Sequence, residues 1–118
     1  MTKKHDHFLL VCSNCRGSDS TDLAIRTLAG RLPDGFAIRM VNCMAGCDRP
    51  TTIGFQAPGK AQYLFGDIAT HEDLDAVVEF AEQYLRCADG WTNATDRPQA
   101  LFTKTLSRMP RIEQGVSL

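Results

Sequence analysis

The sequence lacks a long hydrophobic run and an excess of charge of either sign. Its apolar runs are only a few residues long, too short to cross a bilayer or to form the core of a signal peptide. It has 13 basic and 14 acidic residues, and this balance offers no general attraction to nucleic acid or to a membrane surface. We therefore expect a cytoplasmic protein that binds neither nucleic acid nor membrane.

The sequence also lacks the residue patterns that mark an enzyme. It contains no recognisable pairing of a nucleophile with a base, no phosphate-binding loop and no Rossmann set of glycines. We therefore expect no catalytic residues. With 118 residues, the chain is long enough for one domain that has its own hydrophobic core.

Cysteine is scarce, but four of the five cysteines form two pairs. Cys12 and Cys15 form a Cys-x-x-Cys motif, and Cys43 and Cys47 form a Cys-x-x-x-Cys motif. In a reducing cytoplasm, such pairs more often bind metal or carry out redox chemistry than form structural disulfides. The fifth cysteine, Cys87, stands alone near the end of a predicted helix, and we expect it to be a packing residue and not a ligand.

Hydrophobic periodicity predicts a β-α-β unit followed by a β-β-α unit. Apolar runs and alternating patterns predict strands over residues 8–12, 36–43, 51–56 and 61–65. Amphipathic spacing predicts helices over residues 20–32 and 71–86. Ser20 is the expected N-cap of the first helix, and Thr70 with Asp73 is expected to form a capping box at the second.

The composition changes after residue 87. Asp89-Gly90 and Thr92-Asn93 are typical of a linker, and Pro98 opens a short helical pattern with Phe102, Leu106 and Met109 on one face. This tail is predicted to be a helix docked loosely on the sheet or its edge, or else a docking segment for a partner. We expect residues 1–7 to form a flexible arm, residues 8–87 the folded domain, and residues 88–118 a linker with a helical tail.

Each cysteine pair follows a predicted strand. Cys12 ends the first strand and Cys43 follows the second. In a β-α-β unit the strands are parallel, so their carboxyl ends lie side by side, about 4.8 Å apart. The two pairs should therefore meet at one edge of the sheet. Four converging thiolates suit an iron–sulfur cluster or a tetrahedral zinc ion, and a Cys-x-x-Cys alone suits thiol–disulfide exchange.

The motifs resemble two related groups of proteins. The run from Cys43 to Pro50, followed by a hairpin and a last helix, resembles the thioredoxin-like [2Fe–2S] ferredoxins over about residues 8–86. The run from Val11 to Arg16 and the tail around Arg97-Pro98 resemble more closely an uncharacterised bacterial family of predicted metal-binding proteins, the DUF1636 type, some of them linked to cobalamin synthesis. The resemblance implies an α/β, thioredoxin-like sandwich with a β-α-β-β-β-α core and a short C-terminal helical extension.

The resemblance also implies a function. It implies a one-electron carrier whose [2Fe–2S] cluster is ligated by Cys12, Cys15, Cys43 and Cys47 and which exchanges electrons with a redox partner protein. The close spacing of Cys12 and Cys15 departs from the ferredoxin pattern and keeps a Cys₄ zinc protein, structural or metal-handling, as an alternative. A thiol–disulfide protein is the second alternative, and a homodimer is an option for the assembly.

One stretch of the chain is strongly acidic and lacks Lys and Arg from residue 61 to residue 85. Its carboxylates are Asp67, Glu72, Asp73, Asp75, Glu79 and Glu82. They form either the solvated face of the last helix or an electrostatic docking face for a basic redox partner.

Overall fold

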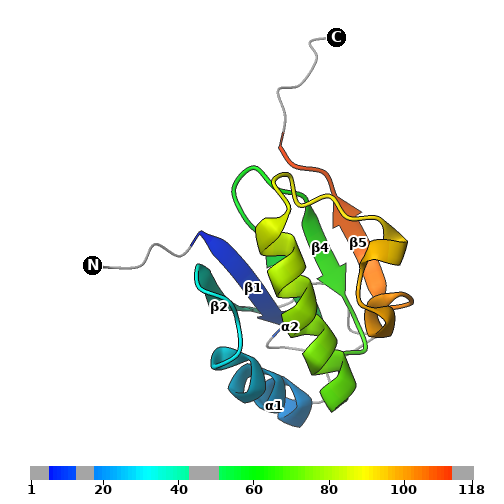
Figure 1. Ribbon diagram of the computed structural model, residues 1–118. Coiled ribbons are helices and arrows are strands. Elements are labelled where there is room, and N and C mark those ends of the chain that lie inside the picture. The colour runs from blue at the N-terminus through cyan, green and yellow to red at the C-terminus, as the bar shows by residue number, and fades with distance from the viewer. Residues whose placement is uncertain (1–5, 13–17, 43–50, 113–118) are drawn as a thin grey trace.

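The computed structural model describes residues 6–12, 18–42 and 51–112. Its strands and helices are β1 (His7–Cys12), α1 (Ser18–Ala29), β2 (Phe36–Val41), β3 (Ile53–Gln56), β4 (Gln62–Phe65), α2 (His71–Arg86) and β5 (Thr105–Met109). Two 3-10 turns, η1 (Ala94–Asp96) and η2 (Gln99–Leu101), precede β5. The element order confirms the predicted α/β class (Figure 1).

The strands form one mixed sheet in the order β2-β1-β3-β4-β5. β1 and β2 are parallel, with Cys12 opposite Val41, as the β-α-β pattern predicts. β3 is antiparallel to β1, and the following pairs are antiparallel as well. This arrangement is compatible with a thioredoxin-like fold, and it brings the end of β1, the end of β2 and the start of β3 to the same edge.

Both helices lie over the same face of the sheet (Figure 1). On this face, Leu9 and Val11 of β1 alternate inward and join the core with Ala24 and Leu28 of α1. Aromatic rings from β3, β4 and α2 form its centre, and the ring centroids of Phe55 and Phe80 lie 4.9 Å apart. The hydrophobic core is therefore one layer between the sheet and the two helices.

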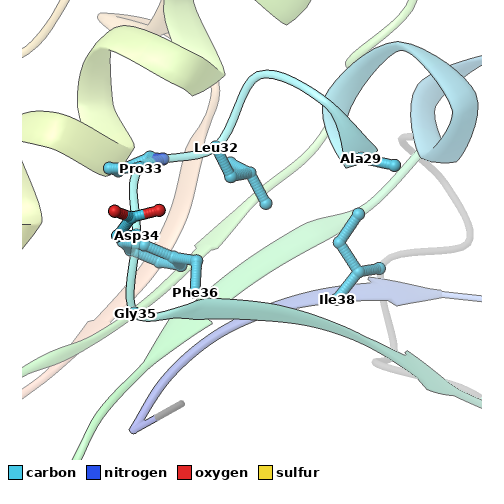
Figure 2. A pocket seen from close by; sticks show the side chains of 7 residues that line it. All are labelled: Ala29, Leu32, Pro33, Asp34, Gly35, Phe36 and Ile38. Carbon is cyan, nitrogen blue, oxygen red and sulfur yellow. The ribbon is translucent and has the colours of Figure 1, made fainter. Parts of the chain in front are cut away.

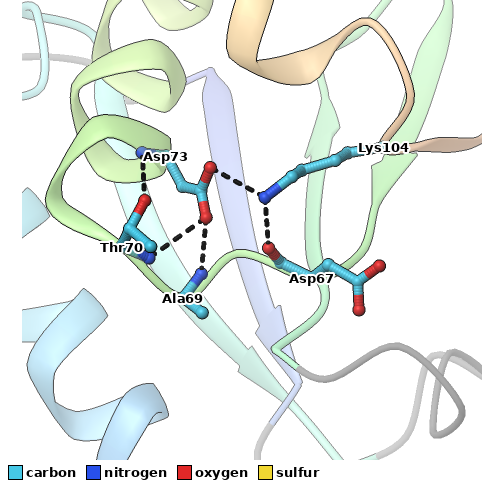
Figure 3. Close-up of polar contacts among 5 residues, drawn as sticks. All are labelled: Asp67, Ala69, Thr70, Asp73 and Lys104. Atoms are coloured by element: carbon cyan, nitrogen blue, oxygen red, sulfur yellow. Dashed lines mark hydrogen bonds and ion pairs between the residues drawn. The ribbon is translucent and has the colours of Figure 1, made fainter.

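The start of α2 matches its predicted capping box. The Thr70 hydroxyl accepts a hydrogen bond from the Asp73 amide, and the Asp73 carboxylate accepts from the amides of Thr70 and Ala69, at 3.1 and 2.9 Å (Figure 3). The start of α1 differs from the prediction, because the helix begins at Ser18 and includes Ser20 in its first turn.

The C-terminal extension corrects one prediction. The 3-10 turn η2 follows Pro98, but Thr105–Met109 form strand β5 where a helix was expected. β5 pairs antiparallel with β4, with an irregularity in register between Leu64 and Phe65. The physical reason is that β4 would otherwise leave a row of backbone N–H and C=O groups unpaired at the edge of the sheet, and β5 pairs with them.

The segment before β5 is held by buried hydrogen bonds. The Tyr63 hydroxyl donates to the Gly90 carbonyl at 2.7 Å and accepts from the Thr92 amide at 2.8 Å. The Arg97 guanidinium donates to the hydroxyl and the carbonyl of Thr92, both at 3.0 Å. Residues 90–109 are therefore anchored to the folded domain that was predicted over residues 8–87. Among the described residues, no helix is long and apolar enough to span a membrane.

Candidate metal centre

Cys12 lies where three strand ends meet. It is the last residue of β1 and is completely buried. Its Sγ lies 4.0 Å from the carbonyl oxygen of Asn42, the residue after β2, and its amide donates to the Thr52 carbonyl at 3.1 Å. The residues that precede and follow the second cysteine pair along the chain are thus within contact of Cys12.

The other three predicted ligands, Cys15, Cys43 and Cys47, lie outside the described residues. The segment with Cys15 continues directly from Cys12, and the segment with the second pair runs between Asn42 and Thr51. Both segments therefore leave the sheet at the same edge. The parallel pairing that this convergence requires is confirmed, and the ligand set itself stays a prediction.

In the part of the chain that the structure describes, a buried hydroxyl at this edge makes no hydrogen bond. Thr51 is 1% exposed, and in the described part of the chain its Oγ1 makes no hydrogen bond, although its carbonyl accepts from the Ile68 amide. Buried hydroxyls are usually satisfied, so an orphaned one next to a predicted ligand site is informative. A sulfur-rich metal group would supply the missing acceptor, and this orphaned donor fits such a group beside the cysteine segments.

Cys87 lies at the opposite end of the sheet. It caps the end of α2, and its Sγ lies 3.4 Å from the Trp91 carbonyl. Lys60, in the turn after β3, donates to the last carbonyls of α2 at Tyr84 and Leu85. Because β3 runs antiparallel to β1, this turn lies beside the start of β1 and far from Cys12.

The same end of the molecule contains buried polar groups with structural partners. Burial lowers the pKa of Lys60, while its ammonium is bonded to the end of α2. Burial raises the pKa of Tyr84, whose hydroxyl donates to the Ala61 carbonyl at 2.6 Å. His7 Nδ1 lies 2.8 Å from Asp6, also at the start of β1, and in the described part of the chain its buried Nε2 makes no hydrogen bond. These groups lie away from the cysteine edge. His71, exposed at the first turn of α2, lies instead toward the cysteine edge, because the amide of Ile68, just before α2, donates to the Thr51 carbonyl.

The acidic stretch is partly neutralised by residues far away in the sequence. Lys104 lies 2.7 Å from the Asp73 carboxylate, and Arg31 lies 2.8 Å from the Asp75 carboxylate. Burial alone would raise the pKa of Asp73, but hydrogen bonds from Lys104 and from two backbone amides outweigh it and hold that pKa below its ordinary value. Sequence reasoning missed both cations, because they come from outside residues 61–85.

A hollow of about 350 Å³ lies between the end of α1 and β2 (Figure 2). It is lined mainly by apolar side chains, among them Leu32, Phe36 and Ile38, with the carboxylate of Asp34. It adjoins the amino end of β2 and so lies away from Cys12. Within residues 6–12, 18–42 and 51–112, no three Cys, His, Asp or Glu side chains come together as metal ligands.

Comparison with known proteins places the chain in a family. The curated proteins and the solved structures contain no match to it, so the resemblance to [2Fe–2S] ferredoxins stays a prediction. One family model, described as a protein of unknown function, matches residues 9–111. This match includes both cysteine pairs and extends to the end of β5. The chain therefore belongs to the family of proteins of unknown function DUF1636.

Proposed function

We propose that this protein is a one-electron carrier that holds a [2Fe–2S] cluster through Cys12, Cys15, Cys43 and Cys47. The observation that carries the proposal is the position of Cys12, whose sulfur and amide contact Asn42 and Thr52 on the two sides of the second cysteine segment. Thiolates are the usual ligands of such clusters. The two pairs are therefore attached close enough to supply one ligand set.

The residues of the chain would hold the cluster and regulate its properties. When bound, a [2Fe–2S] cluster supplies one-electron redox chemistry. Cys12, at the end of an inner strand, would hold the cluster, and the Thr51 hydroxyl, which makes no hydrogen bond in the described part of the chain, would donate to a sulfur. Four thiolates complete the coordination and leave no position for a substrate, which supports a carrier over an enzyme.

The proposed partner is a redox protein. The carboxylates of Glu72, Glu79 and Glu82 are exposed on α2, whereas Asp73 and Asp75 are paired with cations. The face that a basic partner would contact therefore has less net negative charge than the sequence implied. If the partner docks there, electron-transfer rates should fall modestly as salt rises, because exposed charges are screened within about 10 Å at 0.1 M.

The proposal is tested by producing the full chain in cells with intact iron–sulfur assembly and purifying it without oxygen. We expect a coloured protein with two iron and two sulfide per chain, which bleaches on reduction and then gives a paramagnetic signal from one electron. Colourless protein with one zinc per chain would overturn the carrier and favour the Cys₄ zinc alternative, which the Cys-x-x-Cys spacing also permits. Metal-free protein with a reversible Cys12–Cys15 disulfide would favour thiol–disulfide exchange.

A further inference from the structure

The second face of the sheet lies opposite α1 and α2. Alternation along the strands and the registers between them assign this open face to Phe8, Leu10, Cys12, Ala37, Arg39, Val41, Gly54, Gln56, Gln62, Leu64, Ser107 and Met109, of which Cys12 is completely buried. Among the described residues, no helix lies over it (Figure 1). Its apolar members Phe8, Leu10, Val41 and Leu64 are partly exposed and do not belong to the hydrophobic core. The open face thus has apolar side chains that remain partly exposed.

The open face is uneven. A hollow of about 200 Å³ lies over Gly54 between Leu10 and Leu64, and a second of about 260 Å³ adjoins it next to Phe8. A Cβ atom at Gly54 would lie 3.2 Å from the Tyr63 carbonyl oxygen and 3.5 Å from the Leu10 side chain, so a larger residue there would crowd the first hollow. The absence of a side chain at Gly54 therefore creates a depression at the centre of the sheet.

Apolar side chains project at the border of the same face. Met109 lines the first hollow and is 58% exposed, and Ile112 lines the second and is 89% exposed. A surface that carries both a depression and projecting apolar groups can match a second copy of itself. In a two-fold contact, the projecting group of each copy meets the depression of the other.

The charge of the face also suits a second copy. Arg39, on the edge strand β2, is its one charged side chain in the part of the chain that the structure describes. Near its centre, the polar side chains among the described residues are uncharged, and the amides of Gln56 and Gln62 form a hydrogen bond at 3.4 Å across the strands. Two copies could therefore meet without placing like charges opposite each other at the centre, where such repulsion costs most.

The area of the open face indicates how strongly two copies should associate. Five strands spaced about 4.8 Å apart, each with about five residues of 3.3 Å, cover roughly 400 Å² on each copy. Met109 and Ile112 at the border enlarge this area. The sum for two copies lies at or below the low end for specific protein interfaces, which corresponds to weak or transient association.

We propose that the open face is the contact surface of a weak, two-fold homodimer, in which the two sheets pack face to face. Sheets packed in this way lie about 10 Å apart and are held by interdigitating apolar side chains. Leu64 and Leu10 would be buried at the centre, and Ile112 of each copy would enter the hollow beside Phe8 of the other. Cys12 lies at the end of the same face, but the proposed contact is centred on Leu10 and Leu64, and its test needs no bound metal.

The test is sedimentation equilibrium of the full chain, as purified and with reductant, over a wide concentration range. The average mass should rise from the 13.0 kDa of one chain toward twice that value. Leu64→Lys should weaken association by about tenfold or more, because it places an unpaired ammonium in the contact. Ile112→Lys should also weaken it, and since Ile112 is almost fully exposed, this variant keeps the native fold. Phe102→Lys is the matched control, because Phe102 is 46% exposed beside α2, and it should leave association unchanged.

Two results would overturn the proposal. One is a full chain that stays monomeric at all concentrations. If such a chain dimerises only after deletion of residues 113–118, the face is assigned to its own C-terminus and the proposal is equally overturned. The other is a dimer that neither Leu64→Lys nor Ile112→Lys weakens. Loss of the dimer in both variants, with full retention in Phe102→Lys, would support it.

Discussion

The ammonium of Lys104 lies 2.7 Å from the carboxylate of Asp73 and joins the C-terminal extension to the first turn of α2 (Figure 3). The same ammonium donates to the Asp67 carbonyl at 2.7 Å. Asp67 has a φ of 57°, in the left-handed region that few residues other than glycine adopt. One cation therefore stabilises both the turn before α2 and the capping carboxylate.

Replacing Asp73 by Asn should destabilise the fold by about 2 kcal/mol at pH 7, because it leaves a partly buried ammonium without its partner. The pKa of Asp73 is lower in the folded chain than in the unfolded chain. The stabilisation is therefore complete above pH about 4 and is lost as the pH falls through the folded pKa. Denaturant unfolding of both proteins at pH 7 and pH 3 should show the difference shrink at low pH.

The exposed pair of Arg31 and Asp75 is the control for this measurement. Its side chains are 43% and 62% exposed, so Asp75→Asn should cost no more than about 0.5 kcal/mol. If Asp73→Asn and Asp75→Asn lower the free energy of unfolding by the same amount, the buried pair does not stabilise the fold more than the exposed pair.

Replacing Tyr63 by Phe should release the segment before β5. The change leaves the Gly90 carbonyl and the Thr92 amide without the hydroxyl that bonds both, at a cost of about 1–3 kcal/mol. Hydrogen exchange of residues 90–109 should accelerate more than exchange in α2. Tyr84→Phe is the control, because it removes a hydroxyl from the same core, but this hydroxyl donates to the Ala61 carbonyl and not to the extension. In this variant, hydrogen exchange of residues 90–109 should change only as much as the global stability changes.

Each of four single replacements by Ser should lower the bound metal per chain by at least half: those of Cys12, Cys15, Cys43 and Cys47. Cys87→Ser should retain it, because Cys87 lies at the opposite end of the sheet from Cys12. Metal content per chain, measured on anaerobically purified protein, checks this. Full retention in Cys12→Ser, or an equal loss in Cys87→Ser, would contradict the ligand assignment.

Replacing Thr51 by Val tests the orphaned hydroxyl. In metal-free protein, the change should be neutral or stabilise the fold by up to about 1 kcal/mol, because it removes an unpaired buried group. In metal-loaded protein, it should weaken metal binding by about tenfold if the hydroxyl supports a ligand. Thr51→Ser keeps the hydroxyl and is the control for the loaded protein. Equal metal affinity in all three proteins would exclude this role for Thr51.

Local patterns were sufficient for much of the fold. The apolar stripe of α2 and the Thr70–Asp73 capping box depend on residues within a few positions of one another, and both form as predicted. The run that ends at Cys12 is apolar throughout, which is typical of an inner strand, and β1 pairs on both sides, although Phe8 and Leu10 are partly exposed. From these elements, the meeting of the β1 and β2 ends followed by topology alone.

The tail shows where local pattern fails. The segment with Leu106 and Met109 is too short for its periodicity to distinguish a helix from a strand. Its conformation depends on the free edge of β4, which is remote in sequence and whose hydrogen-bonding groups it pairs. A pattern read within a window of residues contains no information about such an edge.

The sequence by itself determined the α/β order and the attachment of the segments with both cysteine pairs to one edge, because these follow from periodicity and from the handedness of a β-α-β unit. Only the tertiary structure decided that β5 extends the sheet and that Arg31 and Lys104 neutralise carboxylates of α2. It also decided that one face of the sheet keeps its apolar side chains outside the core. Each of these depends on contacts between segments far apart in the chain, where packing and hydrogen bonding outweigh local preference.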